Sequence, residues 1–186
     1  AESNACMKCI VAAPSAGSCG VLPSVLVPFV EKYNIDEDTV LKALYLSAGF
    51  GQIIAHRASI AGAEGGCQAE IGSASAMAAG ALAFLQKGTV KQIVNAAALS
   101  LKNMLGLTCD PVKGLVEVPC IKRNSYGAVN AVTSAQLAMA GIESAITPDD
   151  VIDSMRRIGN SMPACLKETG TGGLAVTESA NKYLGK

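Results

Sequence analysis

The stretch from Gln68 to Lys87 reads QAEIGSASAMAAGALAFLQK, and Glu70 is its only charged residue before the final lysine. Apolar side chains point in nearly every direction around a helix of this sequence, and a helix that is apolar all round is normally buried. Most of these side chains are small, which lets neighbouring helices approach closely. The stretch therefore predicts a central helix in an Ala- and Gly-rich fold.

The sequence on both sides of this stretch also carries helical signals. Three-to-four-residue apolar spacing, acidic first turns, capping threonines and an early proline mark the helix starts. The expected helices are Val21–Tyr33, Asp36–His56, Gln68–Lys87, Val90–Leu105, Asn124–Ala140 and Thr147–Gly159. We expect an all-α fold: a compact, Ala/Gly-rich helical domain with long functional loops, formed as a single domain over residues 1–186.

Four loops are expected between and beside these helices, because Gly, Pro and Ser are frequent there. Gly106–Asn124 is the longest and contains two of the seven cysteines, with a short strand expected at Leu115–Val118. A long loop inside a compact domain is more often functional than not. The other loops are Ala13–Gly20, Ser59–Cys67 and Met162–Leu174.

Composition argues against several classes of protein. Lys plus Arg and Asp plus Glu both number 15, so the basic excess typical of nucleic-acid binders is absent. The longest nearly uncharged apolar run, Ile71–Leu85, is shorter than the ~20 residues that a membrane-spanning helix needs. Ala1–Lys8 lacks the pattern of a signal peptide, and seven is an odd cysteine count for a disulfide scaffold. We expect reduced thiols, a cytoplasmic location, and no nucleic-acid or membrane partner.

Three cysteines have neighbours suited to metal ligation. Cys67 follows two glycines, Cys109 precedes Asp110-Pro111, and Cys120 follows Pro119. Glycine and proline fix the backbone and leave the sulfur uncrowded, as a cluster ligand requires. The usual zinc and ferredoxin spacings are absent, so spacing leaves the kind of metal open.

Several strings around these cysteines resemble the iron–sulfur-dependent L-serine dehydratases. They are GAEGGCQAEIGSASAMAA at Gly62–Ala79, LTCDPV at Leu107–Val112, GLVEVPCIKRN at Gly114–Asn124, and shorter matches at Ala12–Ser18 and Met162–Gly170. The chain resembles most of the α chain of the two-subunit type, without an N-terminal portion.

The resemblance implies a [4Fe–4S] cluster on Cys67, Cys109 and Cys120 and conversion of L-serine to pyruvate and ammonia. An iron without a cysteine ligand would act as a Lewis acid on the substrate hydroxyl. It also implies a β chain that completes the active site, and hence an oligomer.

Two carboxylates are candidates for the catalytic base, Glu64 and Glu168, because each lies in a Gly-rich loop. The alternative for each side chain, which the sequence favours, is a helix cap or a backbone anchor, and the partner chain is a further source of the base. The candidate contacts for the substrate's amino and carboxylate groups are Ser15, Ser18, Ser59 and Asn124. The alternative for these four is a turn-stabilising role.

Two other functions remain open from the sequence. One is a structural zinc domain without catalysis, and the other is a related cluster-dependent cysteine desulfidase. Pyridoxal-phosphate chemistry is excluded, since none of the lysines has the setting of a Schiff-base residue with a phosphate cup.

Overall fold

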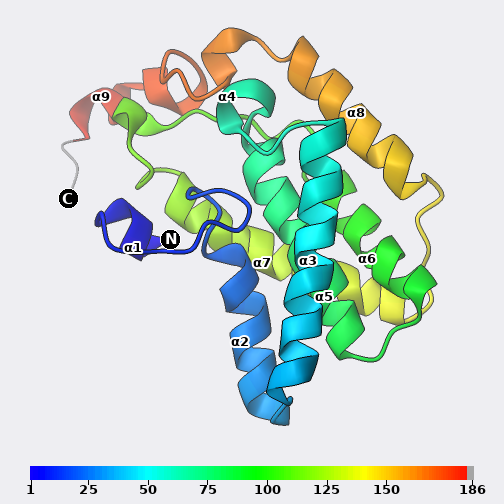
Figure 1. The fold of residues 1–186 in the computed structure, drawn as a ribbon. Helices are drawn as coiled ribbons and strands as arrows, with labels where there is room; N and C mark the ends of the chain where they lie inside the picture. Colours follow the sequence, from blue (N-terminus) through cyan, green and yellow to red (C-terminus); the bar gives the residue numbers. More distant parts are fainter. Residues whose placement is uncertain (184–186) are drawn as a thin grey trace.

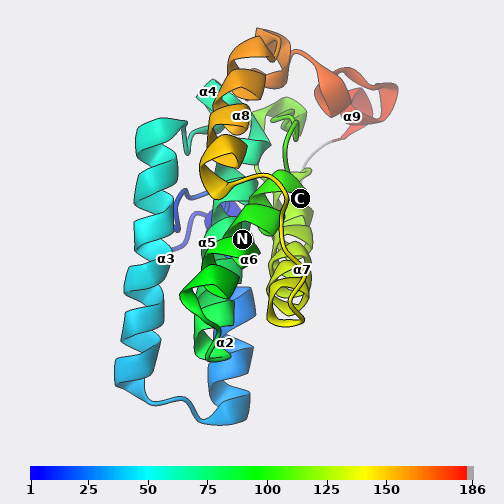
Figure 2. The ribbon, with the colours of Figure 1, turned by 90° about the vertical axis from the view of Figure 1, so that its right-hand side faces the viewer.

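The computed structural model describes residues 1–183 as helices and loops, with no β-strand in that range. One helix, α5 (Ser73–Leu85), lies in the centre, and four others pack against it. In Figure 1 α3 stands in front of α5, and the turned view of Figure 2 shows α3 on one side of α5 and α7 on the other. The four surrounding helices are α2 (Val21–Tyr33), α3 (Glu37–Arg57), α6 (Val90–Lys102) and α7 (Cys120–Met139). The predicted all-α fold class is confirmed.

The small side chains of α5 explain why it is surrounded. Every residue of this helix except Phe84 is buried. At Gly80, the ring of Phe50 from α3 occupies the place where a Cβ atom would stand. Close approach of this kind requires glycine at position 80, because the interior is packed without spare volume.

A buried polar network ties three of these helices together. The Ser75 hydroxyl of α5 donates to the carbonyl of Gly127 in α7 at 2.7 Å. The side-chain amide of Asn130, also in α7, donates to the Ser75 hydroxyl at 2.9 Å and to the carbonyl of Ser100 in α6 at 3.0 Å. Because buried polar groups are costly when unpaired, this network favours one alignment of the three helices.

The predicted helix Gln68–Lys87 is divided in the structure. A π-helical turn, η1 (Gln68–Gly72), precedes α5, which ends two residues early at Leu85. Buried Gln68 accounts for the wide turn: its side-chain amide donates to the Met155 carbonyl, and its oxygen accepts from the Gly106 amide, both at 2.9 Å. A wide turn of this type is common at functional sites.

Helix α8 (Pro148–Ser161) crosses over this end of α5, above the short helix α4 (Gly62–Gly65) in the view of Figure 1. It begins at the predicted proline, where the Thr147 hydroxyl accepts a hydrogen bond from the Asp150 amide at 3.2 Å. It touches α4 closely, since a Cβ atom on Gly159 would lie 3.0 Å from the Gly65 Cα atom.

Two loop predictions need correction. Leu115–Val118 is a turn, because no neighbouring strand exists among residues 1–183 to pair with it. Helix α7 begins at Cys120, four residues before the predicted start at Asn124, so Cys120 belongs to a helix and not to the long loop. The remaining short elements are α1 (Glu2–Ala5), η2 (Val112–Gly114), η3 (Ala164–Leu166), η4 (Gly173–Val176) and α9 (Glu178–Lys182).

None of the helices within residues 1–183 has the length and hydropathy needed to span a bilayer.

The close contact at Gly80 gives a test of this packing. We expect Gly80→Ala to lower the free energy of unfolding by about 1–3 kcal/mol, because the added methyl group overlaps the Phe50 ring. Urea unfolding followed by circular dichroism measures the change. Gly49→Ala in α3 is the matched control, since a Cβ atom there meets nothing within 4 Å. Equal stability of the two variants would contradict the packing described for α5.

Candidate metal centre and active site

The three predicted cysteines meet at one buried point, although they come from separate segments. Cys67 lies between α4 and η1, Cys109 in the loop after α6, and Cys120 in the first turn of α7. All three are buried, the sulfurs of Cys67 and Cys109 lie within 4.8 Å of each other, and Cys120 interacts with Cys67. The structure thus brings together the residues that the sequence marked as possible metal ligands.

The C-terminal part of the chain holds Cys109 in place. The Cys109 amide donates to the Leu166 carbonyl at 2.8 Å, and the Glu168 amide donates to the Cys109 carbonyl at 2.7 Å. One residue further, the Asp110 carboxylate accepts a hydrogen bond from the Leu174 amide at 2.9 Å. Gly173 makes this turn possible, with a φ of 59° and no room for a Cβ atom beside Asp110.

Arg123 of α7 places a positive charge beside the thiols. Its guanidinium pairs with Asp110 at 2.9 Å and donates to the Thr108 carbonyl at 2.8 Å. The same group lies 3.5 Å from the Cys67 sulfur. A fixed cation at this distance favours the thiolate form of cysteine.

The three thiols differ in pKa. Hydrogen bonds from Cys109 and Cys120, with a further contribution from Arg123, lower the pKa of Cys67 to about 3. The pKa values of Cys109 and Cys120 are raised, because each is hydrogen-bonded to the Cys67 sulfur and is buried. Three thiolates in so small a space repel one another unless a bound cation compensates them. Soft sulfur donors of this kind suit zinc or an iron–sulfur cluster.

A carboxylate that sequence reasoning missed, Glu70, lies against the thiols. One of its oxygens and the sulfurs of Cys67 and Cys109 all lie within 4.8 Å of one another. Burial raises the pKa of Glu70 to about 6, although a hydrogen bond with Ser15 acts in the opposite direction. The signal available in the sequence was a single acidic residue in an otherwise apolar central stretch.

Gly62 lies beside the side chains of Cys109, Glu70 and Glu168. A Cβ atom on Gly62 would lie 3.1 Å from the Cys109 sulfur, 3.1 Å from a Glu70 oxygen and 3.3 Å from a Glu168 oxygen. Glu168 therefore lies near the Cys109 thiol, and its predicted catalytic role stays untested. Its φ of 64° is unusual for a residue with a side chain, and such strained backbone is frequent at functional sites.

Three further predicted residues, Ser15, Ser18 and Asn124, come from the N-terminal loop and α7. The Ser15 hydroxyl contacts Glu70 and lies 2.9 Å from the hydroxyl of buried Ser18. Asn124 donates to the carbonyls of Gly17 and Cys120, both at 2.8 Å, and accepts from the Gly20 amide at 2.9 Å. It thereby fastens the N-terminal loop to the helix that carries Cys120. Of these three residues, Ser15 alone has a contact to Glu70, and their roles toward substrate stay predictions.

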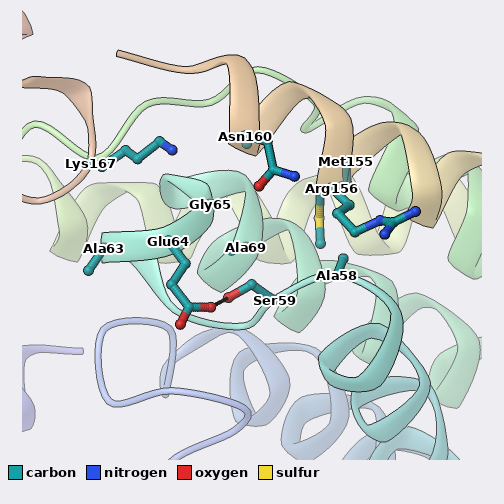
Figure 3. A pocket seen from close by; sticks show the side chains of 11 residues that line it. Ala58, Ser59, Ala63, Glu64, Gly65, Ala69, Met155, Arg156, Asn160 and Lys167 are labelled. Atoms are coloured by element: carbon teal, nitrogen blue, oxygen red, sulfur yellow. Dashed lines mark hydrogen bonds between the residues drawn. The ribbon is translucent and has the colours of Figure 1, made fainter. Parts of the chain in front are cut away.

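Glu64 and Ser59 face another space. The Ser59 hydroxyl donates to the Glu64 carboxylate at 2.6 Å, and both side chains line a cavity of about 280 Å³ between α4 and α8 (Figure 3). None of the three cysteines lines that cavity. The structure therefore does not bring Glu64 or Ser59 together with the thiols, and their predicted catalytic and substrate-binding roles stay untested.

Known proteins resemble the chain over nearly its whole length. A family model described as serine dehydratase alpha chain matches residues 1–175. The probable L-serine dehydratase alpha chain of Bacillus subtilis is 52% identical over 97% of this chain and 60% of its own length. The L-serine dehydratase alpha chain of Peptoniphilus asaccharolyticus is 52% identical over 97% of this chain and 62% of its own length. A probable L-serine dehydratase alpha chain of Latilactobacillus sakei is 51% identical over 95% of this chain and 84% of its own length. The chain spans about three fifths of the length of the first two relatives.

The contacts of Asn124 generate a prediction about the site. Asn124→Asp keeps the size of the side chain but replaces the amide donor with an acceptor, so two carbonyls lose their hydrogen bonds. We expect the free energy of unfolding to fall by about 1–3 kcal/mol in urea titrations. We also expect weaker thiolate-to-cobalt absorption when Co²⁺ is added. Asn181→Asp in the exposed part of α9 is the control, and equal results for both variants would contradict the anchoring role.

Proposed function

Because the chain belongs to the serine dehydratase alpha chain family, as its sequence strings indicate, we propose that it is the cluster-binding part of an L-serine dehydratase. The reaction converts L-serine to pyruvate and ammonia. The observation that carries this proposal is the meeting of Cys67, Cys109 and Cys120 at one buried point beside two carboxylates. The names of the relatives support the same activity.

We propose that the three cysteines hold a [4Fe–4S] cluster. The donor set supports this, because three thiols converge and Arg123 supplies compensating charge for sulfur-bound negative charge. When bound by three cysteines, such a cluster supplies a Lewis-acidic iron that polarises a hydroxyl leaving group.

The residues beside the thiols supply the rest of the chemistry. Loss of water from L-serine requires removal of the proton on Cα, and we propose Glu70 as its acceptor. Its carboxylate lies next to the Cys67 and Cys109 sulfurs, and Ser15 orients it through a hydrogen bond. We propose that Glu168, whose carboxylate also lies beside Gly62, holds the substrate ammonium group. The enamine that results from the elimination tautomerises to an imine, which hydrolyses to pyruvate and ammonia.

We infer further that residues 1–186 act as one catalytic unit and that a β chain completes the active site in an oligomer. The word alpha in the relatives' names supports a multi-subunit enzyme. All seven cysteines are free thiols, which suits a reducing compartment such as the cytoplasm.

The cluster assignment is tested by anaerobic reconstitution with iron and sulfide. We expect brown protein with about four iron and four sulfide per chain. Single Cys67→Ser, Cys109→Ser and Cys120→Ser replacements should each lower the iron content and abolish pyruvate formation with the β chain added. Cys165→Ser, at an exposed thiol, is the matched control.

Two results would overturn this assignment. One is colourless wild-type protein with a single zinc ion, and the other is full iron content in all three variants. Ammonia release from L-serine and from L-cysteine, measured side by side, distinguishes a dehydratase from a cysteine desulfidase.

The role of Glu70 is tested by the isosteric replacement Glu70→Gln. We expect kcat to fall by about 10²–10⁴-fold with unchanged iron content, since the amide cannot accept the Cα proton. Glu64→Gln and Glu168→Gln are measured in parallel, because both residues are candidates on sequence grounds. If Glu70→Gln retains full turnover while Glu64→Gln or Glu168→Gln loses it, the base is not Glu70.

A further inference from the structure

The cavity between α4 and α8 has walls of mixed character (Figure 3). Glu64 and Ser59 line one side, and Asn160 of α8 points in from the opposite side. The Lys167 side chain extends toward Asn160, while Arg156 lies at the other end of the cavity. Between these polar groups lie apolar surfaces from Ala58, Ala69 and Met155.

One layer of backbone separates this cavity from the thiols. In the segment from residue 62 to residue 70, the residues next to the sulfurs are Gly62 and Glu70, with Cys67 itself. Gly65 and Ala69 of the same segment line the cavity instead. The cavity is therefore a separate space that shares one wall with the candidate active site.

The walls of the cavity are held in place without a ligand. Gly159 of α8 packs directly on Gly65 of α4, with no room for larger side chains. The Gln68 amide donates to the Met155 carbonyl at 2.9 Å and thereby fixes α8 to the turn that follows Cys67. A preformed space with a few convergent polar groups is typical of small-molecule sites.

The charges in the cavity match a zwitterion. Within residues 1–183, neither Lys167 nor Arg156 forms an ion pair, and the Glu64 carboxylate accepts a single short hydrogen bond from Ser59. An anionic group and two cationic groups thus line a volume of about 280 Å³, which is large enough for a small ligand. An amino acid with a short side chain carries both complementary charges within that size.

We propose that this cavity is a second binding site, which takes a small α-amino acid and is distinct from the thiol site. Lys167 and Asn160 receive the carboxylate, Glu64 receives the ammonium group, and the short side chain contacts Met155 and Ala58. Arg156 adds positive potential at its end of the cavity.

A ligand bound in this cavity affects the position of Cys109 through the backbone on either side of Lys167. Lys167 stands between Leu166 and Glu168, whose carbonyl and amide are hydrogen-bonded to Cys109. A ligand that holds the Lys167 side chain in the cavity therefore restrains the segment that positions Cys109.

The test is calorimetric titration with L-alanine, which has no hydroxyl group to lose. The Cys67→Ser variant of the purified protein is the background, because binding there does not depend on the proposed cluster. We expect about one equivalent of L-alanine to bind, and propionate, which lacks the ammonium group, to bind at least about tenfold more weakly.

Cavity variants in the same background locate the binding. Lys167→Met and Asn160→Leu should each weaken L-alanine binding at least about tenfold. Arg157→Met is the matched control, because Arg157 donates to Ser154 and does not line the cavity. Asn160→Leu keeps the test valid if Lys167→Met disturbs the Cys109 segment. The proposal is overturned if the Cys67→Ser protein binds no L-alanine, or if both cavity variants bind it as tightly as the control.

Discussion

Burial of α5 along almost its whole length is the constraint on which the remaining structure depends. A helix buried on all sides must present small side chains to every neighbour, and Gly80 against Phe50 shows how little space remains. The four helices around α5 are consequently fixed in position. The π-helical turn at its N-terminal end leaves that packed core and directs Cys67 and Glu70 toward the loops. The rigid centre therefore supports a site made of irregular backbone.

Charge compensation governs that site in turn. Three thiols lie close together, the carboxylates of Glu70 and Glu168 lie beside the Cys109 thiol at Gly62, and the guanidinium of Arg123 contacts the Cys67 sulfur. Asp110 orients Arg123 and is itself enclosed by the turn at Gly173. The turn at Gly173 thus binds the Asp110 carboxylate through the Leu174 amide. It affects the thiols indirectly, because Asp110 pairs with Arg123 and Arg123 contacts the Cys67 sulfur. Such outer contacts commonly tune the affinity of a metal site as strongly as the ligands do.

Much of the fold was predictable, because its signals are local. Apolar periodicity, the acidic first turn from Asp36 and the caps at Thr89 and Thr147 predicted helices whose bounds agree within a few residues. The three cysteines were identifiable from their flanking residues. The position of Glu70 was not, because it depends on the widened turn that Gln68 makes through contacts with residues 38 and 87 positions away. The separation of Glu64 from the thiols likewise follows from the placement of α8, which local sequence does not encode.

The pairing of Cys109 with Leu166 and Glu168 also bears on how the protein matures. During synthesis, Cys67, Cys109 and Cys120 all leave the ribosome well before their supporting segment exists. The loop around Cys109 lacks its backbone partners until residue 168 has been made, and Asp110 lacks its partner until residue 174. A complete set of correctly oriented thiols therefore arises only after residue 174 has been made, more than fifty residues after Cys120. Any metal that needs all three thiols would accordingly be bound after that point in synthesis.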